Sequence, residues 1–245
     1  MEATVGDECS QALEGVTSQE AMEEVEVIEL DQEVKNVDLT RRRIRKIADL
    51  DFLTDVESLL RWNLISKMEN LSSLVKLTQL DIYDNQITKI EGLEALVNLE
   101  VLDLCYNRIT KLEGLKTLTK LKTFYIMHNK IEKMEGLETL TELEYLELGD
   151  NRIKKIEGLD KCTKIERLML GANQIQKIEN LGNLLTDFWA RQNKLPNIEA
   201  IQELTSLPKL NLIYLDFNPL AEDKKYREKV IAAIPTLKQL DATLL

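Results

Sequence analysis

The chain has 245 residues, 31% of them charged, and a formal net charge of −11 at pH 7. It holds no uninterrupted apolar run of about 20 residues, so we expect no transmembrane helix, and its acidic start argues against a signal peptide. Three cysteines without metal-type spacing favour a reducing compartment over a disulfide-stapled fold, and a single histidine makes a zinc site or a His-dependent active site a poor hypothesis.

All of the net charge lies at the N-terminus. Eleven of the 43 acidic residues fall within residues 1–34, a stretch of sequence without Lys or Arg, and the other 32 acidic residues balance the 32 basic ones. A block of one sign is typical of a solvated tail or an interaction arm, so we predict a largely disordered acidic tail over residues 1–33. A short helix over residues 18–33 is an equally supported alternative, because Thr17 and Glu20 have capping-box spacing.

The sequence from residue 34 onward is built from repeats of nearly constant length. Leucine accounts for 43 residues of the chain, and the pattern Leu-x-Leu/Ile-x-x-Asn recurs throughout this region. Its asparagines are evenly spaced at Asn63, Asn85, Asn107, Asn129, Asn151 and Asn173, and Asn193 and Asn218 then follow at a shorter and a longer interval. Arg42 holds the corresponding place one repeat before the first of them. We therefore predict an α/β solenoid of about nine 22-residue leucine-rich repeats over residues 34–218.

Each repeat combines two apolar periods. Alternation around Leu80 and Ile82 predicts a short strand, and apolar residues at every third position from Ile87 to Leu99 predict a 3₁₀ segment. Stacked repeats would form a concave parallel sheet and a convex 3₁₀ face, with the asparagines as a hydrogen-bonded ladder.

A left-handed turn is predicted once in every repeat. Seven positions after each of the first seven ladder positions, Arg42 included, the sequence holds only Gly, Asn or Asp, the residue types that tolerate positive φ; they are Asp49, Asn70, Gly92, Gly114, Gly136, Gly158 and Asn180. A glutamate precedes six of these positions, and we interpret this row as a solvated face paired with lysines two positions earlier.

The end of the chain reads as a cap over the last repeat, residues 219–245. An amphipathic helix is expected over residues 223–234, with Tyr226 and Val230 on its apolar side, and Pro235 ends it. Leu237, Leu240 and Leu244 are then expected to return to the core.

A candidate binding surface follows from the alternation in the strands. The outward position four places before each ladder residue mixes acidic and large side chains, namely Asp38, Asp81, Asp103, Tyr125, Glu147, Met169, Trp189 and Tyr214. We predict that Tyr125, Met169, Trp189 and Tyr214 are exposed, and exposed aromatic residues are typical interface anchors. The acidic residues suit a basic patch on a protein partner and would repel nucleic-acid phosphates.

The repeat resembles that of the leucine-rich-repeat regulatory subunits of protein phosphatase 1, the regulatory subunit 7 family. The resemblance covers roughly residues 34–245 and includes the stretches Leu80-Asp81-Ile82-Tyr83-Asp84-Asn85-Gln86-Ile87, Leu146-Glu147-Leu148-Gly149-Asp150-Asn151-Arg152-Ile153, Asp187-Phe188-Trp189 and Tyr214-Leu215-Asp216-Phe217-Asn218-Pro219-Leu220, followed by matching cap residues. That family usually carries more repeats, so the chain looks like a shortened member. Its second repeat is one residue short and its seventh is two residues short.

The resemblance implies a non-catalytic protein that binds the phosphatase 1 catalytic subunit and modulates its activity or location. It implies contacts from Asp103, Tyr125, Glu147, Met169, Asp187, Trp189 and Tyr214, to which the outward row adds Asp81. It further implies a ternary complex with another regulatory protein, residence in nucleus and cytoplasm, and no cofactor, metal, nucleic acid or membrane.

Two other functions remain open. The same repeat would serve an axonemal, centrosomal or splicing-type scaffold that binds another protein. An enzyme is the weakest hypothesis, because the sequence lacks the G-x-x-x-x-G-K, H-E-x-x-H and G-x-S-x-G motifs.

Overall fold

The computed structural model describes residues 36–47, 57–182 and 184–245. The chain divides into two units, Met1–Asp31 and Gln32–Leu245, and only the second contains described residues. The predicted acidic tail over residues 1–33 and the predicted turn at Asp49 lie outside them.

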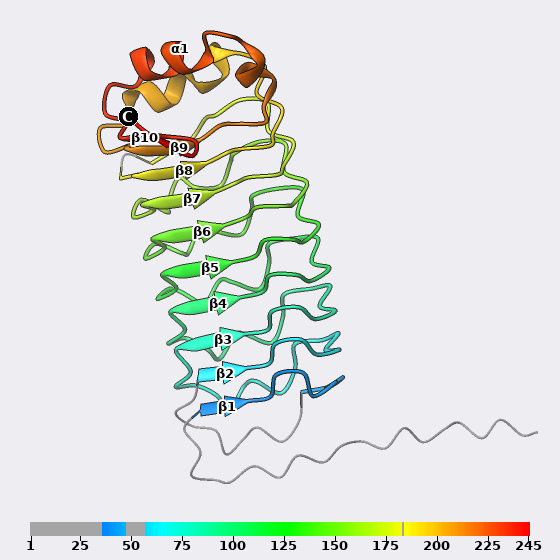
Figure 1. Cartoon of the computed structure of the whole chain (residues 1–245). Coiled ribbons are helices and arrows are strands. Elements are labelled where there is room, and N and C mark those ends of the chain that lie inside the picture. Colours follow the sequence, from blue (N-terminus) through cyan, green and yellow to red (C-terminus); the bar gives the residue numbers. More distant parts are fainter. Residues whose placement is uncertain (1–35, 48–56, 183) are drawn as a thin grey trace, which may run out of the picture. The chain divides into compact units, whose positions relative to one another are not determined.

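The second unit is a stack of coils joined by one sheet. Among the described residues the sheet has eleven strands in chain order, β1 to β10 paired in parallel and β11 antiparallel to β10. The strands line one side of the stack and the turns line the other (Figure 1). Their bounds are β1 (Asn36–Asp38), β2 (Glu57–Leu59), β3 (Gln79–Asp81), β4 (Val101–Asp103), β5 (Thr123–Tyr125), β6 (Tyr145–Glu147), β7 (Arg167–Met169), β8 (Asp187–Trp189), β9 (Leu212–Tyr214), β10 (Gln239–Leu240) and β11 (Thr243–Leu244).

The predicted alternation is confirmed for the inward residue of each strand, whereas the outward residues Asp81 of β3 and Met169 of β7 are buried as well. In β3 to β9 the middle residue is buried against the neighbouring coils; these residues are Leu80, Leu102, Phe124, Leu146, Leu168, Phe188 and Ile213. The leucines of the turns, such as Leu93, Leu96 and Leu99, are buried as well. One coil cannot bury both sets alone, so the core exists only between stacked coils.

The asparagine ladder is confirmed, and Asn107 shows how it works. Its Nδ2 donates to the backbone oxygens of Leu104 at 3.1 Å, Cys105 at 3.2 Å and, one coil earlier, Ile82 at 3.0 Å. Its Oδ1 accepts from the N–H of Ile87 at 2.9 Å. A buried amide that both donates and accepts therefore closes its own loop and fastens it to the preceding coil.

The regular part of the solenoid is shorter than nine units. The six coils from Asn63 to Asn173 keep one constant interval, whereas the interval to Asn193 is shorter and the interval from there to Asn218 is longer. The longer last interval contains the 3₁₀ helix η1 (Ile198–Ser206), which the shorter coils lack room to form. The structure thus has about six regular turns flanked by irregular ones, fewer than the roughly nine units predicted.

The convex 3₁₀ segments of the regular coils are isolated 3₁₀-type turns and not continuous helices. Leu96 donates to the oxygen of Leu93, and Leu99 to that of Leu96, both at 3.0 Å. These bonds have the 3₁₀ span, but they are three residues apart, so each closes a single turn instead of propagating a helix. The two 3₁₀ helices of the described residues, η1 and η2 (Pro219–Glu222), lie in the last coils.

The predicted left-handed turns are confirmed at the six described positions. At Gly114, φ is +69°, and an added Cβ would lie 2.4 Å from the backbone oxygen of Ile90 in the preceding coil. Asn70 and Asn180 do carry a Cβ there, and each donates its Nδ2 to the equivalent oxygen, of Ile47 at 2.6 Å and of Ile156 at 2.8 Å. The adjoining glutamates pair with lysines as predicted in the pairs Lys67–Glu69, Lys89–Glu91 and Lys177–Glu179.

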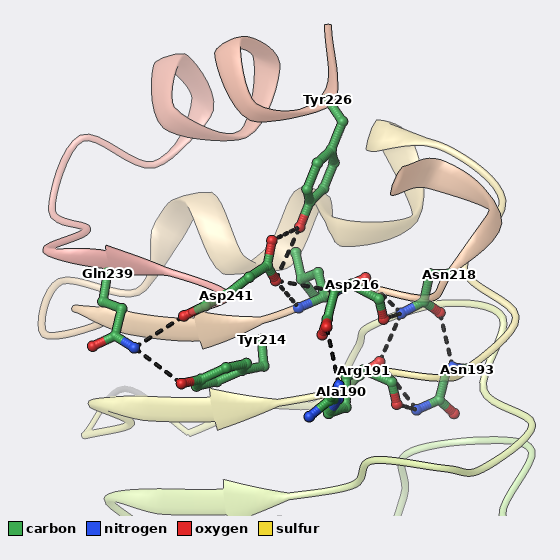
Figure 2. Close-up of polar contacts among 10 residues, drawn as sticks. Ala190, Arg191, Asn193, Tyr214, Asp216, Asn218, Tyr226, Gln239 and Asp241 are labelled. Atoms are coloured by element: carbon green, nitrogen blue, oxygen red, sulfur yellow. Dashed lines mark hydrogen bonds and ion pairs between the residues drawn. The ribbon is translucent and has the colours of Figure 1, made fainter. Parts of the chain in front are cut away.

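The C-terminal cap contains the helix α1 (Tyr226–Ala233), shorter than predicted, and it packs against η1 and η2. Figure 2 shows the Tyr226 hydroxyl directed at Asp241, to whose Oδ2 it donates at 3.1 Å. The Asp241 Oδ1 accepts from the backbone N–H groups of Leu215 at 2.8 Å and Asp216 at 3.0 Å. Leu237 and Leu240 are buried, but Leu244 is exposed, because it lies on the terminal strand β11. None of the described helices is long and apolar enough to cross a bilayer.

Candidate protein-binding face

Seven outward side chains on neighbouring strands form one continuous line, which we call the central row. In-register pairing from β3 to β9 places each member directly beside the next: Asp81, Asp103, Tyr125, Glu147, Met169, Trp189 and Tyr214. The same pairing places Asp38, through Leu59, in line with Asp81. Parallel strands about 4.8 Å apart thus bring residues that are a full repeat apart in sequence into contact distance.

The acidic end of the central row is largely engaged within the protein. The carboxylate of Asp81 is buried, accepts from the Arg61 Nε in a short ion pair, and accepts from the N–H of Tyr83 at 3.1 Å. Asp103 accepts from the N–H of Cys105 at 2.9 Å. Burial raises the pKa of the Asp103 carboxyl, and the neighbouring Asp81 charge adds to this effect. Asp81 is therefore held by an ion pair with Arg61, whereas Asp103 is held by a backbone N–H group.

The middle of the row is a mixed aromatic and acidic cluster. The rings of Tyr125 and Tyr145 lie 5.2 Å apart, and the Arg167 guanidinium lies 4.9 Å from the Tyr145 ring centroid. Glu147 accepts from the Tyr145 hydroxyl at 3.1 Å and from the N–H of Gly149 at 3.2 Å. Burial raises the pKa of Glu147, which these two hydrogen bonds only partly offset. The Glu147 carboxylate is therefore partly buried and held in one orientation by its hydrogen bonds.

The C-terminal end of the row is aromatic. Trp189 is 37% exposed, and its ring lies 4.6 Å from that of Tyr214. Gln239 of β10 donates to the Tyr214 hydroxyl at 3.0 Å, as Figure 2 shows, so the cap fixes the orientation of this ring. Met169 was predicted to be exposed, and this is wrong: it is 6% exposed, placed between Glu147 and Trp189 in the register. Met169 therefore presents little surface to a partner.

Asp187 belongs to a second line of outward residues. It begins β8, two positions before Trp189, and pairs in register with Arg167. Burial raises the pKa of the Asp187 carboxyl, and the Arg167 charge opposes this shift. Asp187 therefore lies beside the central row, close to Trp189.

Several residues of this face were missed from the sequence. Arg191 donates to Asp216 at 3.1 Å just beyond the strand ends, while the second carboxylate oxygen of Asp216 is buried without a hydrogen-bond partner. Arg61 and Tyr145 hold the acidic members of the central row in place. All four are outward by the same alternation, two positions before or after the row, so the signal was present. In the described part of the chain, no group of three or more His, Cys, Asp or Glu side chains is placed to hold a metal ion.

Comparison with protein families agrees with this architecture. A model described as Leucine-rich repeat matches residues 138–244, and one described as Leucine Rich repeats (2 copies) matches residues 97–139. Together they cover residues 97–244, more than half of the chain. The chain is a leucine-rich-repeat protein.

Curated relatives of this leucine-rich-repeat protein bear the names of phosphatase regulators. It is 43% identical over 47 residues to protein phosphatase 1 regulatory subunit 7 of Xenopus tropicalis, covering 19% of this chain and 14% of that one. It is 39% identical over 64 residues to protein phosphatase 1 regulatory subunit SDS22 of Schizosaccharomyces pombe, covering 25% and 19%. The human regulatory subunit 7 is 44% identical over 43 residues, covering 18% and 12%. The matched segments thus span less than a fifth of each relative.

Solved structures share the fold of the leucine-rich-repeat protein at low sequence identity. An internalin, InlF of Listeria monocytogenes, superposes with a TM-score of 0.76 at 23% identity, covering 87% of this chain and 62% of that one. The leucine-rich-repeat domain of APL1B superposes with a TM-score of 0.69 at 17% identity, covering 84% and 68%. These structural similarities concern the fold of the solenoid alone.

Proposed function

We propose that this leucine-rich-repeat protein is a non-catalytic regulator that binds the catalytic subunit of protein phosphatase 1 through the central row. The names of its curated relatives support the partner. The observation that carries the proposal is the unbroken in-register line from Tyr125 to Tyr214, with Glu147 and Trp189 within it. The mechanism is surface docking, and it would act on the activity or location of the phosphatase in the nucleus and cytoplasm.

The physical basis of docking differs along the row. Trp189 and Tyr214 already contact each other, and Gln239 of the cap donates a hydrogen bond to the Tyr214 hydroxyl, so burying the two rings costs little side-chain entropy. Glu147 and Asp103 provide negative charge to select a basic patch, which favours specificity and association rate over affinity. We therefore expect Trp189 to contribute most of the binding free energy.

Binding should be measured by calorimetry between the purified full-length chain and a purified phosphatase 1 catalytic subunit. Trp189→Ala should weaken binding by about tenfold or more, as truncation of an aromatic anchor does, and Glu147→Lys should slow association most at low salt. Val97→Ala is the matched control, because Val97 is exposed on the turn side of the stack.

The outcomes separate the function from the site. If the wild-type chain shows no binding, the phosphatase proposal is wrong. If it binds and Trp189→Ala matches Val97→Ala, the partner stands and the assignment of the central row is wrong. Capture of tubulin or dynein components from lysate in place of the phosphatase would favour the scaffold function.

A further inference from the structure

A second surface feature lies at the end of the strands in the first described coils. Four ring side chains, Trp62, Tyr83, Tyr106 and His128, follow one another along this border, which we call the aromatic edge. Their ring centroids are separated by 5.7, 4.9 and 4.3 Å in that order. His128 ends the series with a hydrogen bond to Asp150. The series crosses four coils without a break, so residues far apart in sequence form one surface.

The backbone under the aromatic edge does not call for aromatic residues. Trp62, Tyr106 and His128 precede ladder asparagines and have φ of +52°, +56° and +55°. Asp84 and Asp150 adopt the same conformation at the same place in other coils, with φ of +51° and +49°. Bulky residues are unfavourable at positive φ, whereas Asp tolerates it, so the turn alone would be better served by Asp. The turn itself therefore does not require the rings, and their succession is a feature of the surface.

Basic residues adjoin the start of the aromatic edge. The segment Leu39–Ile47 contains five Arg or Lys residues and no acidic one. The Arg41 guanidinium lies 4.5 Å from the Trp62 ring centroid, and the Arg61 guanidinium lies 5.8 Å from that of Tyr83. Trp62 is 39% exposed, so this part of the edge is accessible to a partner.

The geometry of the rings selects the chemistry of the partner. Each ring contacts the next, so the ring faces are largely occupied and the ring edges remain. Ring edges carry the positive end of the aromatic quadrupole, and together with guanidinium groups they attract carboxylate and carbonyl oxygens. Nucleic-acid bases would instead need free ring faces on which to stack. Asp84 lies within the series and would repel an acidic group placed directly over it.

We propose that the aromatic edge docks an extended acidic segment of a partner protein, with carboxylates near Arg41 and the chain running across the rings towards His128. The charge complementarity of the Leu39–Ile47 segment supports an acidic partner, and the line of rings supports an extended one. This proposal does not depend on phosphatase binding, because the aromatic edge shares no side chain with the central row.

The test is fluorescence anisotropy with the full-length chain and two labelled peptides, (Glu-Pro)₆ as the acidic probe and (Gln-Pro)₆ as its neutral match. The acidic peptide should bind, more weakly as salt is raised, and the neutral one should bind at least about tenfold more weakly. Trp62→Ala should weaken acidic-peptide binding by about tenfold, while Trp62→Phe, which keeps a ring, should stay within about threefold.

The chain offers a closely matched control at its other end. Phe217 occupies the same turn position, with φ of +57°, is 68% exposed, and lies 5.1 Å from the Arg191 guanidinium. Phe217→Ala should leave peptide binding unchanged. Equal binding of both peptides, or equal effects of Trp62→Ala and Phe217→Ala, would overturn the proposal. Tighter binding of an oligothymidylate would assign the edge to nucleic acid, and binding only after deletion of residues 1–34 would assign it to the chain's own acidic segment.

Discussion

Replacing Gly114 tests how the coils are held together at the left-handed turn. Gly114→Ala places an L-residue at φ near +69°, which costs roughly 1–2 kcal/mol. The new Cβ would also meet the Ile90 oxygen at 2.4 Å, so the backbone must shift, and forced overpacking typically costs about 1–3 kcal/mol. The variant should therefore lose about 2–5 kcal/mol of stability against unfolding.

Gly114→Asn should be less harmful although its side chain is larger. At Asn70 and Asn180 the same turn is built with a side-chain amide that donates to the carbonyl of the preceding coil. That hydrogen bond contributes about 0.5–1.5 kcal/mol, and Asn tolerates positive φ better than Ala. We expect Gly114→Asn to be more stable than Gly114→Ala by about 1–2 kcal/mol.

The measurement is urea-induced unfolding followed by circular dichroism, with all variants fitted to a common slope. Gly182→Ala is the control, because an added Cβ there meets no atom within 4 Å and its φ is not in the left-handed region. It should stay within about 1 kcal/mol of the wild type. If Gly114→Ala proved as stable as Gly114→Asn, the carbonyl contact would not govern this turn.

Three further predictions concern the ladder, the central row and the acidic tail. Asn107→Ala should cost about 3 kcal/mol or more in the same urea assay, because it leaves buried backbone groups of two coils without partners; a loss below about 1 kcal/mol would contradict the ladder. Since burial holds the pKa of Glu147 above its ordinary 4.5, the folded state binds the extra proton, and wild-type stability falls as pH rises through and above 4.5. The melting temperature of Glu147→Gln should thus lie above that of the wild type at pH 7, and the two should converge below pH 4.5. A difference in melting temperature that stays constant with pH would refute this. Deleting residues 1–33 should leave the affinity for the phosphatase, measured by calorimetry, mostly unchanged. A large loss of affinity would show that the acidic tail, and not the central row, supplies most of the binding.

The solenoid was predictable because the same residue pattern recurs in successive coils. Asparagine at a fixed interval can satisfy the buried loop groups of neighbouring coils, and glycine or asparagine seven positions later can adopt positive φ. The second left-handed position could not be predicted, because it holds residues such as Trp62, Ala172 and Phe217 that do not favour it. There the hydrogen bonds of the neighbouring coils impose the conformation against the preference of the residue.

The candidate face was predictable as a line of residues, but its energetics were not. Strand alternation placed Asp81 and Trp189 on the same side, and the register confirms this. Alternation does not indicate how far side chains on neighbouring strands cover an outward residue. Neither the ion pair that engages Asp81 nor the burial of Met169 could therefore be predicted. Those properties arise from side chains one coil away, whose reach depends on geometry that a repeat pattern does not encode.

The reversal of chain direction at β11 bears on how molecules of this kind avoid polymerising. A stack of parallel strands has a polarity, and its last strand would be a template for the first coil of another copy. Here β11 runs antiparallel to β10, and the Asp241 carboxylate accepts the N–H groups of Leu215 and Asp216. A second solenoid that approached β11 head-to-tail would meet a strand that runs against its own first strand, so the reversal disfavours parallel continuation of the sheet at this edge.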